Sequence, residues 1–189
     1  MFCNFSLVIN DGDFLALSGN SGCGKTTLLN MIGGLEPVDE GQILVDGFDV
    51  AKKKGKEAYY KYKAGFLFQN FALIENKTVR QNLEMVQKSA RSSASLEEVL
   101  EQVGLGGDAD TYVYKLSGGE QQRVALARLM FKRCEIILAD EPCGSLDAGN
   151  SAMVMQILHR MNDQGRTVVL VTHDEKTIEM EQNVVRLGE

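Results

Sequence analysis

The chain has 189 residues, a formal net charge of −6 and an apolar fraction of 44%. This length fits one domain with a sizeable buried core. No apolar run approaches the ~18 residues that span a bilayer, and the N-terminus lacks the basic and then apolar pattern of a secretory signal. The acidic balance argues against a broad nucleic-acid surface.

The cysteines indicate a reducing compartment. They form no C-x-x-C pair and no metal-ligand spacing, so free thiols in a cytosolic protein are the expected state. The four cysteines are Cys3, Cys23, Cys134 and Cys143.

Strand and helix patterns alternate from the start of the chain. Residues 5–9 and 13–18 are predicted strands, and Asp11-Gly12 between them is a strong hairpin signal. A helix is predicted to follow them and to end at Gly33-Gly34, after the apolar positions that finish with Ile32.

The rest of the chain predicts an α/β core with a helical insertion. The remaining predicted strands are residues 42–45, 135–139 and 167–172. The last two are short, apolar, β-branched runs typical of buried parallel strands, and a helix over about residues 150–162 completes a βαβ crossover. Residues from about 70 to 134 are mainly helical. We therefore expect one domain over residues 1–189, with a parallel sheet, an antiparallel β edge and a helical subdomain over about 70–134.

A phosphate-binding loop lies between a predicted strand and a predicted helix. Its sequence matches G-x-x-x-x-G-K-[ST], and the flanking elements are those the motif requires. The glycines let main-chain amides surround phosphate oxygens, Lys25 supplies charge to the β- and γ-phosphates, and the Thr26 hydroxyl supplies a ligand for Mg²⁺. The predicted nucleotide-binding residues here are Gly19, Asn20, Ser21, Gly22, Cys23, Gly24, Lys25, Thr26 and Thr27.

Two adjacent carboxylates end the predicted strand at residues 135–139. Leaving Asp140 and Glu141 together at the end of a buried strand is costly without a cation or proton partner. Mg²⁺ would offset this cost at Asp140, and Glu141 is then placed to polarise an attacking water. His173 follows another strand, at the edge where α/β sheets place ligands, and is predicted to orient that water. Gln69 is predicted to sense the water or the Mg²⁺.

The segment Leu116-Ser117-Gly118-Gly119-Glu120-Gln121 begins a predicted helix. Ser117 and Glu120 have the spacing of a capping box. Gly118 and Gly119 are poor helix formers, which indicates that an anion approaches bare main chain at this helix start. An ordinary capped helix is the alternative interpretation.

The order of these motifs, together with Ser145-Leu146-Asp147, resembles the nucleotide-binding domain of ATP-binding cassette (ABC) transporters over essentially the whole chain. The resemblance implies two domains paired head to tail around two ATP molecules. Each ATP would contact the phosphate loop of one domain and Ser117, Gly118 and Gly119 of the other. Asp147 would lie at the seam between the domains. Gln69 and the helical insertion would face a transmembrane permease.

Ile32 to Pro37 and Gly65 to Gln69 are similar to exporter ATPases of the macrolide and lipoprotein-release type, and among them to ATPases paired with bacteriocin exporters. The resemblance implies an ATPase on the inner face of the cell membrane, held there by a permease, that drives export of an antimicrobial peptide or similar amphiphile. The alternative is a non-transport ATPase that regulates a permease-like partner in cell division or immunity. ATPases of DNA repair share these motifs, but they carry long coiled coils between the phosphate loop and the Ser117 segment. Translation-factor relatives carry two cassettes in one chain. This sequence shows neither feature, which disfavours both classes.

Three further expectations concern residues outside these motifs. The family's first strand and its adenine-stacking aromatic residue have no counterpart in this sequence, and Phe5 is predicted to be core. His159 is predicted to be a solvated side chain. The cluster of Lys52, Lys53, Lys54, Lys56, Lys61 and Lys63 with interleaved tyrosines is predicted to be a solvated loop and helix, with contact to anionic lipid or nucleic acid as the alternative.

Overall fold

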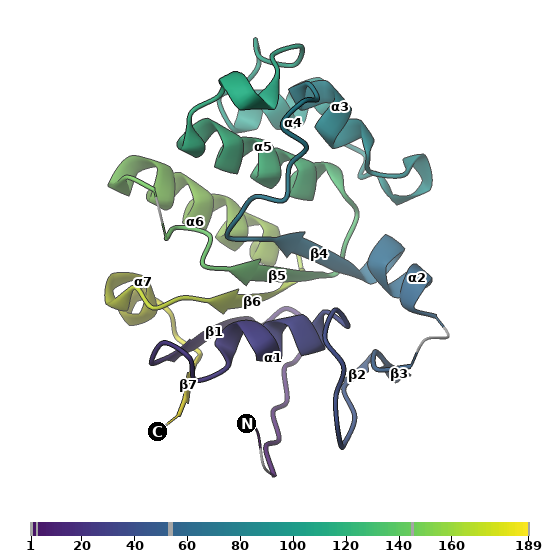
Figure 1. Ribbon diagram of the computed structural model, residues 1–189, viewed down its shortest axis with the longest axis vertical. Coiled ribbons are helices and arrows are strands. Elements are labelled where there is room, and N and C mark those ends of the chain that lie inside the picture. Colours follow the sequence, from purple (N-terminus) through teal and green to yellow (C-terminus); the bar gives the residue numbers. More distant parts are fainter. Residues whose placement is uncertain (1, 3, 53–54, 145, 189) are drawn as a thin grey trace.

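Five parallel strands form the central sheet, in the order β4-β5-β6-β1-β7 (Figure 1). The computed structural model describes residue 2 and residues 4–52, 55–144 and 146–188. The strands of this sheet are β1 (Phe14–Gly19), β4 (Ala64–Leu67), β5 (Ile136–Asp140), β6 (Thr167–Val171) and β7 (Val184–Leu187). The predicted α/β class and the parallel sheet are confirmed.

Apolar residues alternate between the two faces of the sheet and divide the core into two layers. On β5, Ile137 and Ala139 pack on one side, and Leu138 packs on the other. The first side is covered by α5 (Gly118–Phe131) and α6 (Ala148–Asp163), and the second by α1 (Lys25–Ile32). Figure 1 shows α1 separated from α5 and α6 by the strands. The α6 helix joins two neighbouring parallel strands, so the predicted βαβ crossover is confirmed.

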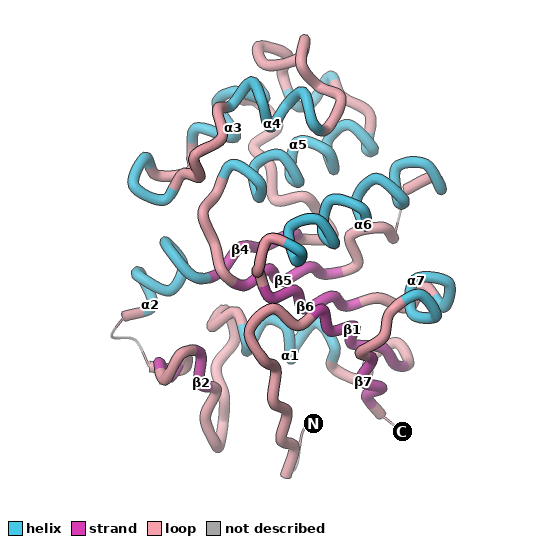
Figure 2. Tube along the Cα trace, turned by 180° about the vertical axis from the view of Figure 1, so that it is seen from behind, coloured by secondary structure: helices cyan, strands magenta, loops and turns pink. Residues whose placement is uncertain are grey.

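The predicted hairpin at the N-terminus is wrong. Residues 5–10 form no strand, and Figure 2 shows them as a loop that leads away from the sheet. The physical reason is that both edges of β1 are occupied by parallel neighbours, β6 and β7. The Asp11-Gly12 turn exists, but the Gly12 amide donates to the Thr167 hydroxyl at 3.0 Å rather than closing a hairpin. Phe5 is 38% exposed, so it is not core.

An antiparallel pair exists elsewhere, between β2 (Leu44–Val45) and β3 (Phe48–Asp49). The first of these two strands falls within the strand predicted over residues 42–45, of which residues 42 and 43 form no strand. The pair is separate from the main sheet and forms the antiparallel edge of the fold.

Three helices between β4 and β5 form the layer farthest from α1 in Figure 1. They are α3 (Val79–Glu84), α4 (Leu96–Gln102) and α5. Each begins with a capping box, at Thr78, Ser95 and Ser117 respectively. That residues 70–134 form a subdomain of their own stays a prediction.

The lysine-rich segment contains a helix, as predicted, but part of the segment is buried and not solvated. It forms α2 (Lys56–Ala58) and a π-helical turn over Tyr59–Lys63. Tyr59 is buried and donates to the Ile32 carbonyl at 2.9 Å, while Lys56 donates to the Gly34 carbonyl at 2.8 Å. Lys53 and Lys54 lie outside the described residues.

Two other findings differ from the sequence analysis. The C-terminal strand β7 was not predicted. His159 stacks on Phe14, with ring centroids 4.3 Å apart, and lies 3.1 Å from Glu181, so its side chain, 43% exposed, has packing partners as well as contact with solvent. Among the described cysteines, Cys23, Cys134 and Cys143 are free thiols, and Cys3 lies outside the described residues. Within the described part of the chain, every helix is too short or too polar to cross a bilayer.

Candidate active site

The phosphate loop connects β1 to α1 with backbone angles that favour glycine. Gly19, Gly22 and Gly24 have φ values of +143°, +81° and +100°, which side chains rarely adopt. A Cβ at Gly19 would also lie 2.3 Å from the Leu187 carbonyl oxygen. The loop therefore requires glycine both for its angles and for the close approach of β7. Thr27, within α1, is half-buried.

Lys25 is buried at the start of α1, and its ammonium group is held by the loop itself. Its Nζ atom donates to the Gly19 carbonyl at 2.7 Å and to the Asn20 carbonyl at 3.0 Å. The side chain is 8% exposed. The charge therefore lies inside the loop, where phosphate oxygens bound by the loop amides would meet it.

Thr26 and Asp140 meet across the gap between α1 and β5. The Thr26 hydroxyl donates to Asp140 Oδ1 at 3.0 Å. Burial raises the pKa of the Asp140 carboxyl above its usual value, and the neighbouring Glu141 carboxylate raises it further, against the lowering effect of the Thr26 hydrogen bond. A hydroxyl and a buried carboxylate are hard oxygen ligands of the kind that Mg²⁺ takes, so these two residues fit that cation.

Glu141 occupies a strained backbone position directly after β5. Its φ is +45°, which costs a non-glycine residue roughly 1–2 kcal/mol, and such strain is concentrated at functional sites. Its amide donates to the Val171 carbonyl at 2.9 Å, which fixes the strained residue against the end of β6. His173 Nδ1 lies 2.6 Å from Glu141 Oε1. The pair therefore spans the ends of two adjacent strands.

One cavity of about 400 Å³ brings the phosphate loop and this pair together. It is lined by Ser18, Gly19, Asn20, Ser21, Lys25, Glu141, His173, Glu175, Arg186 and Leu187. Glu175 and Arg186 were missed by sequence reasoning. Arg186 lies on β7, opposite Ser18 in the strand register, and the short Val184–Leu187 run before Gly188 was the available signal.

Gln69 lies just after β4, at the carboxyl end of the sheet, and is exposed. It does not line the 400 Å³ cavity. The turn that follows is unusual, because Phe71 and Ala72 have φ values of +61° and +47°. Arg128 of α5 donates to the carbonyls of both residues, at 3.0 Å and 2.6 Å respectively.

The predicted capping box at the start of α5 is present. The amide of Ser117 donates to Glu120 Oε2 at 2.8 Å, and the Ser117 hydroxyl donates to the same atom at 2.7 Å. A Cβ at Gly118 would meet no other atom within 4 Å. One at Gly119 would lie 3.0 Å from Asn150 Nδ2, so that glycine has a packing reason within the chain.

Asp147 begins α6 and is connected to the same helix start. It accepts from the Asn150 amide at 3.0 Å and from the Asn150 side chain, which in turn accepts from Arg123 Nη1 of α5. These hydrogen bonds lower the pKa of the Asp147 carboxyl. Ser117, Gly118, Gly119 and Asp147 do not line the 400 Å³ cavity. Among the described residues, these four therefore form a group outside the cavity that the phosphate loop shares with Glu141 and His173. Ser145 lies outside the described residues.

A family model for ABC transporters matches residues 2–144. The chain belongs to the ABC transporter family. It is an ATPase domain of that family. The comparisons with individual proteins agree with this assignment.

Among curated relatives, the chain is 38% identical over 97% of its length to the macrolide export ATP-binding/permease protein MacB of Campylobacter jejuni, of which it covers 30%. It is 38% identical over 97% of its length to the uncharacterised ABC transporter ATP-binding protein MJ1508 of Methanocaldococcus jannaschii, of which it covers 85%. A probable syringafactin export ATP-binding/permease protein of Pseudomonas syringae is 37% identical, with 97% of this chain and 29% of that protein covered. The chain thus spans about a third or less of the two export proteins.

Two solved structures of the ABC cassette MJ0796 have the same fold. One is a dimer in a post-hydrolysis state with ADP and Pi, at a TM-score of 0.83 and 34% identity over 96% of this chain and 83% of that one. The other, also dimeric, has a TM-score of 0.86 and 35% identity over the same shares.

Proposed function

We propose that two copies of this ABC ATPase pair head to tail on ATP and drive export through a permease. The observation that carries the proposal is the separation of the two groups of site residues. The phosphate loop, Glu141 and His173 share one cavity, while Gly118 faces open space at a helix start elsewhere. A helix N-terminus favours an anion, and a second molecule supplies one. The dimeric MJ0796 structures support this arrangement.

Each residue then has a defined role in ATP hydrolysis. The loop amides and Lys25 would hold the phosphates, and Thr26 and Asp140, together with Gln69, would hold Mg²⁺. A magnesium ion held there would neutralise charge on the β- and γ-phosphates. Glu141 accepts a proton from the attacking water, and His173, hydrogen-bonded to it, holds the carboxylate and the water in line with the γ-phosphate.

The segment of the partner from Leu116 to Gln121, called here the signature segment, would complete the site. Ser117 and the amides of Gly118 and Gly119 would contact the γ-phosphate of the ATP bound to the other subunit. Asp147 would lie at the seam, and its link to Asn150 and Arg123 joins it to the signature helix. A single chain then holds ATP but hydrolyses it poorly, because half of the site is missing.

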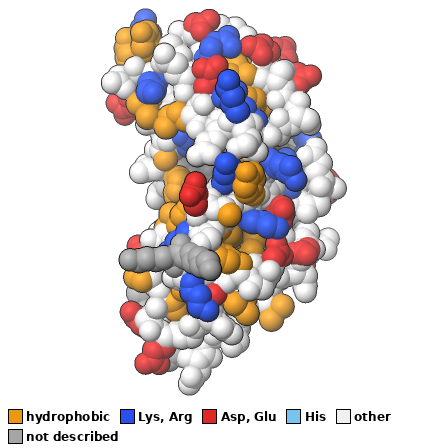
Figure 3. Space-filling model, turned by 90° about the vertical axis from the view of Figure 1, so that its right-hand side faces the viewer, with side chains coloured by type: hydrophobic (Ala, Val, Ile, Leu, Met, Phe, Trp, Pro, Cys, Tyr) orange, Lys and Arg blue, Asp and Glu red, His pale blue; other side chains and the backbone are white. Residues whose placement is uncertain are grey.

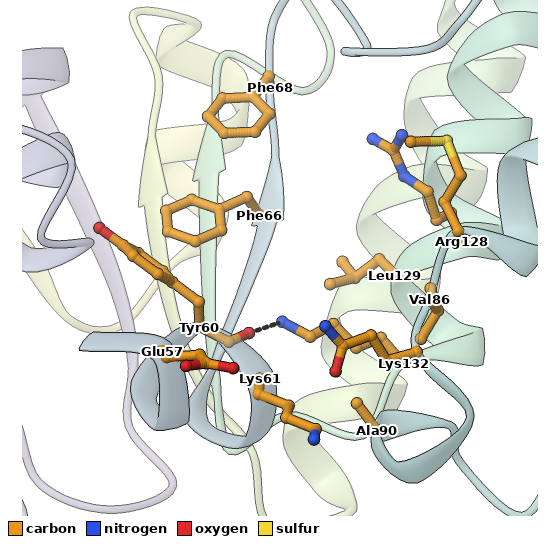
Figure 4. A pocket seen from close by; sticks show the side chains of 12 residues that line it. Glu57, Tyr60, Lys61, Phe66, Phe68, Val86, Ala90, Arg128, Leu129 and Lys132 are labelled. Carbon is orange, nitrogen blue, oxygen red and sulfur yellow. Dashed lines mark hydrogen bonds between the residues drawn. The ribbon is translucent and has the colours of Figure 1, made fainter. Parts of the chain in front are cut away.

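A groove of about 370 Å³ beside Gln69 is the proposed docking place for a cytoplasmic segment of the permease. The rings of Phe66 and Phe68 stack along one wall of the groove. Their centroids are 5.3 Å apart and their planes are nearly parallel. Figure 4 shows Arg128 and Leu129 of α5 on the opposite side, and Lys132, directly after α5, reaching across to Tyr60. The face that carries this groove has hydrophobic side chains next to Lys and Arg side chains (Figure 3).

The charges of the groove indicate the chemistry of that segment. Lys132 donates to the carbonyls of Tyr60 and Ala64, and burial lowers its pKa. Lys61 also lines the groove, and Glu57 is its one carboxylate among the described lining residues. An amphipathic segment with an apolar face and a carboxylate would satisfy both the aromatic wall and the excess positive charge. Docking there would place the ATPase on the inner face of the membrane.

The proposed cargo is an antimicrobial peptide or a similar amphiphile. Export by the curated relatives MacB and the syringafactin protein supports a transport role. The test is copurification with the membrane protein encoded beside this chain, followed by reconstitution in liposomes. ATP-dependent movement of a labelled peptide across the bilayer supports export. ATPase activity that changes with the partner but moves no peptide, lipid or drug favours the alternative, regulation of a permease-like protein.

A further inference from the structure

Arg128 connects the turn after Gln69 to the helix α5, which begins at Gly118. Its guanidinium group donates to two consecutive main-chain carbonyls, those of Phe71 and Ala72. Both residues have left-handed backbone angles although neither is glycine. Consecutive residues of this kind persist only where the surrounding structure holds them.

The held turn lies two residues after Gln69. The Phe71 amide donates to the Phe68 carbonyl at 3.0 Å, and the Ala72 amide donates to the Asn70 carbonyl at 2.6 Å. These bonds make a tight turn that starts at the end of β4. The position of Gln69 therefore depends on whether Phe71 and Ala72 keep their left-handed angles.

Arg128 itself is fixed to the helix that starts at the signature segment. It lies on α5, which begins at Gly118 and continues without a break to Phe131. Burial lowers the pKa of its guanidinium group, and the described residues give it no ion-pair partner. Its hydrogen bonds go to the carbonyls of the turn, so a movement of α5 that carries Arg128 would also pull on the turn.

We propose that Arg128 is a positioning residue for Gln69, and that it ties the turn after Gln69 to the helix carrying Gly118 and Gly119. An ATP that draws the start of α5 toward the partner subunit would then also move the Phe71–Ala72 turn. This inference rests on the proposed function, because it assigns Gln69 a place beside the nucleotide. It concerns a contact within one chain and requires no particular cargo.

The chain offers a specific test through glycine. Glycine adopts the left-handed region without the side-chain penalty, so Ala72→Gly should reduce the need for the Arg128 hydrogen bonds. Ala72 is exposed, which makes this change mild for packing. Asn76→Gly is the matched control, because Asn76 is exposed in the same loop and has no positive φ.

The measurement is steady-state ATP hydrolysis by the full chain as wild type, Arg128→Gln, Ala72→Gly and the double variant. Misplacement of a positioning group lowers kcat by about tenfold or more, while the KM for ATP stays within about twofold because the phosphate loop is untouched. Adding Ala72→Gly to Arg128→Gln should restore at least half of the wild-type kcat, and adding Asn76→Gly should not.

Three outcomes overturn the proposal. They are a normal kcat for Arg128→Gln, a loss that Asn76→Gly repairs as well as Ala72→Gly does, and a loss that Ala72→Gly leaves unchanged. If Arg128→Gln does not fold, the double variant must fold, or the proposal is wrong. A wild-type chain without ATPase activity contradicts the proposed function instead. The same set of variants, measured as unfolding midpoints, then still tests the connection.

Discussion

The Nδ1 atom of His173 lies 2.6 Å from the Oε1 atom of Glu141. The two residues follow adjacent parallel strands, and the amide of Glu141 is anchored to the end of β6 by the Val171 carbonyl. Glu141 is held there with a φ of +45°. The sheet therefore fixes a carboxylate and an imidazole together in the lining of the phosphate-loop cavity, and the proposed proton abstraction from water would use this arrangement.

Replacing Glu141 with Gln should nearly abolish hydrolysis while ATP still binds. The amide keeps the shape of the side chain but cannot accept the proton, so we expect kcat to fall by a factor of about 10² or more. ATP-dependent dimers should accumulate, visible by size-exclusion chromatography with ATP and Mg²⁺. Glu175→Gln changes another carboxylate of the same cavity and serves as the control. Hydrolysis by Glu141→Gln at the native rate would show that Glu141 is not the base.

Replacing Asp140 with Asn should separate two effects of this carboxylate: the stability that its burial costs, and the binding of magnesium. Without nucleotide, Asn accepts the Thr26 hydrogen bond and removes a buried charge, so the unfolding midpoint at pH 7 should stay level or rise. With Mg-ATP at 100 times Kd, wild type should gain about 2.7 kcal/mol of stability, and the variant should lose most of this gain.

The sign of the pH effect at Asp140 follows from its raised pKa. Because its pKa is raised by folding, Asp140 stabilises the folded protein when it is protonated. This contribution to the free energy of unfolding is fully present below the ordinary pKa of 3.8, and it is lost as the pH rises through the higher pKa of the folded protein. Without metal, the advantage of Asp140→Asn over wild type should therefore grow from pH 4 toward pH 7. A constant difference across that range would contradict the burial of this charge.

The capping box predicts a specific titration at Glu120. Its pKa lies below the ordinary 4.5, first because the Ser117 hydroxyl donates to the carboxylate and then because the Ser117 amide does. The capping box therefore stabilises the start of α5 at pH values above the ordinary Glu120 pKa. This contribution is lost as the pH falls through the lowered Glu120 pKa of the folded protein. In Ser117→Ala the Glu120 pKa should move back toward 4.5, as measured by carboxyl NMR. An unchanged pKa would show that the hydroxyl does not hold the carboxylate.

Local sequence signals predicted the parts of this protein that depend on neighbours in the chain. The phosphate loop, the α1 helix after it, the capping box at Ser117 and the α6 crossover are all set by residues within one element or turn. The strand at residues 5–9 failed for the opposite reason. Its apolar alternation is real, but the choice of partner for β1 depends on β6 and β7, which lie more than 140 residues away in the sequence.

The long-range contacts of the site were also beyond the sequence pattern. Gly119 looked like an anion site alone, whereas the structure also shows Asn150 packed against it. The sequence predicts Gln69 as a site residue, but the left-handed turn after it contains no glycine that would indicate its conformation. That turn depends on Arg128, which lies 56 residues beyond Ala72, and no local pattern joins the two.

The central claim is that each ATP site is completed by a second subunit, and mixing two inactive variants tests it directly. Lys25→Ala removes the phosphate-loop charge. Gly118→Asp adds a side chain and a negative charge where the single chain has open space, so it should disturb the partner's ATP and leave the fold intact. Gly107→Asp is the matched control, because a Cβ there also meets nothing within 4 Å.

Each variant alone should be inactive, since both sites of its dimer carry the same defect. A mixed dimer pairs the intact phosphate loop of one subunit with the intact signature segment of the other, which leaves one complete site. We therefore expect ATPase activity to reappear when Lys25→Ala and Gly118→Asp chains are mixed. Activity that stays no higher than that of either variant alone would contradict the account.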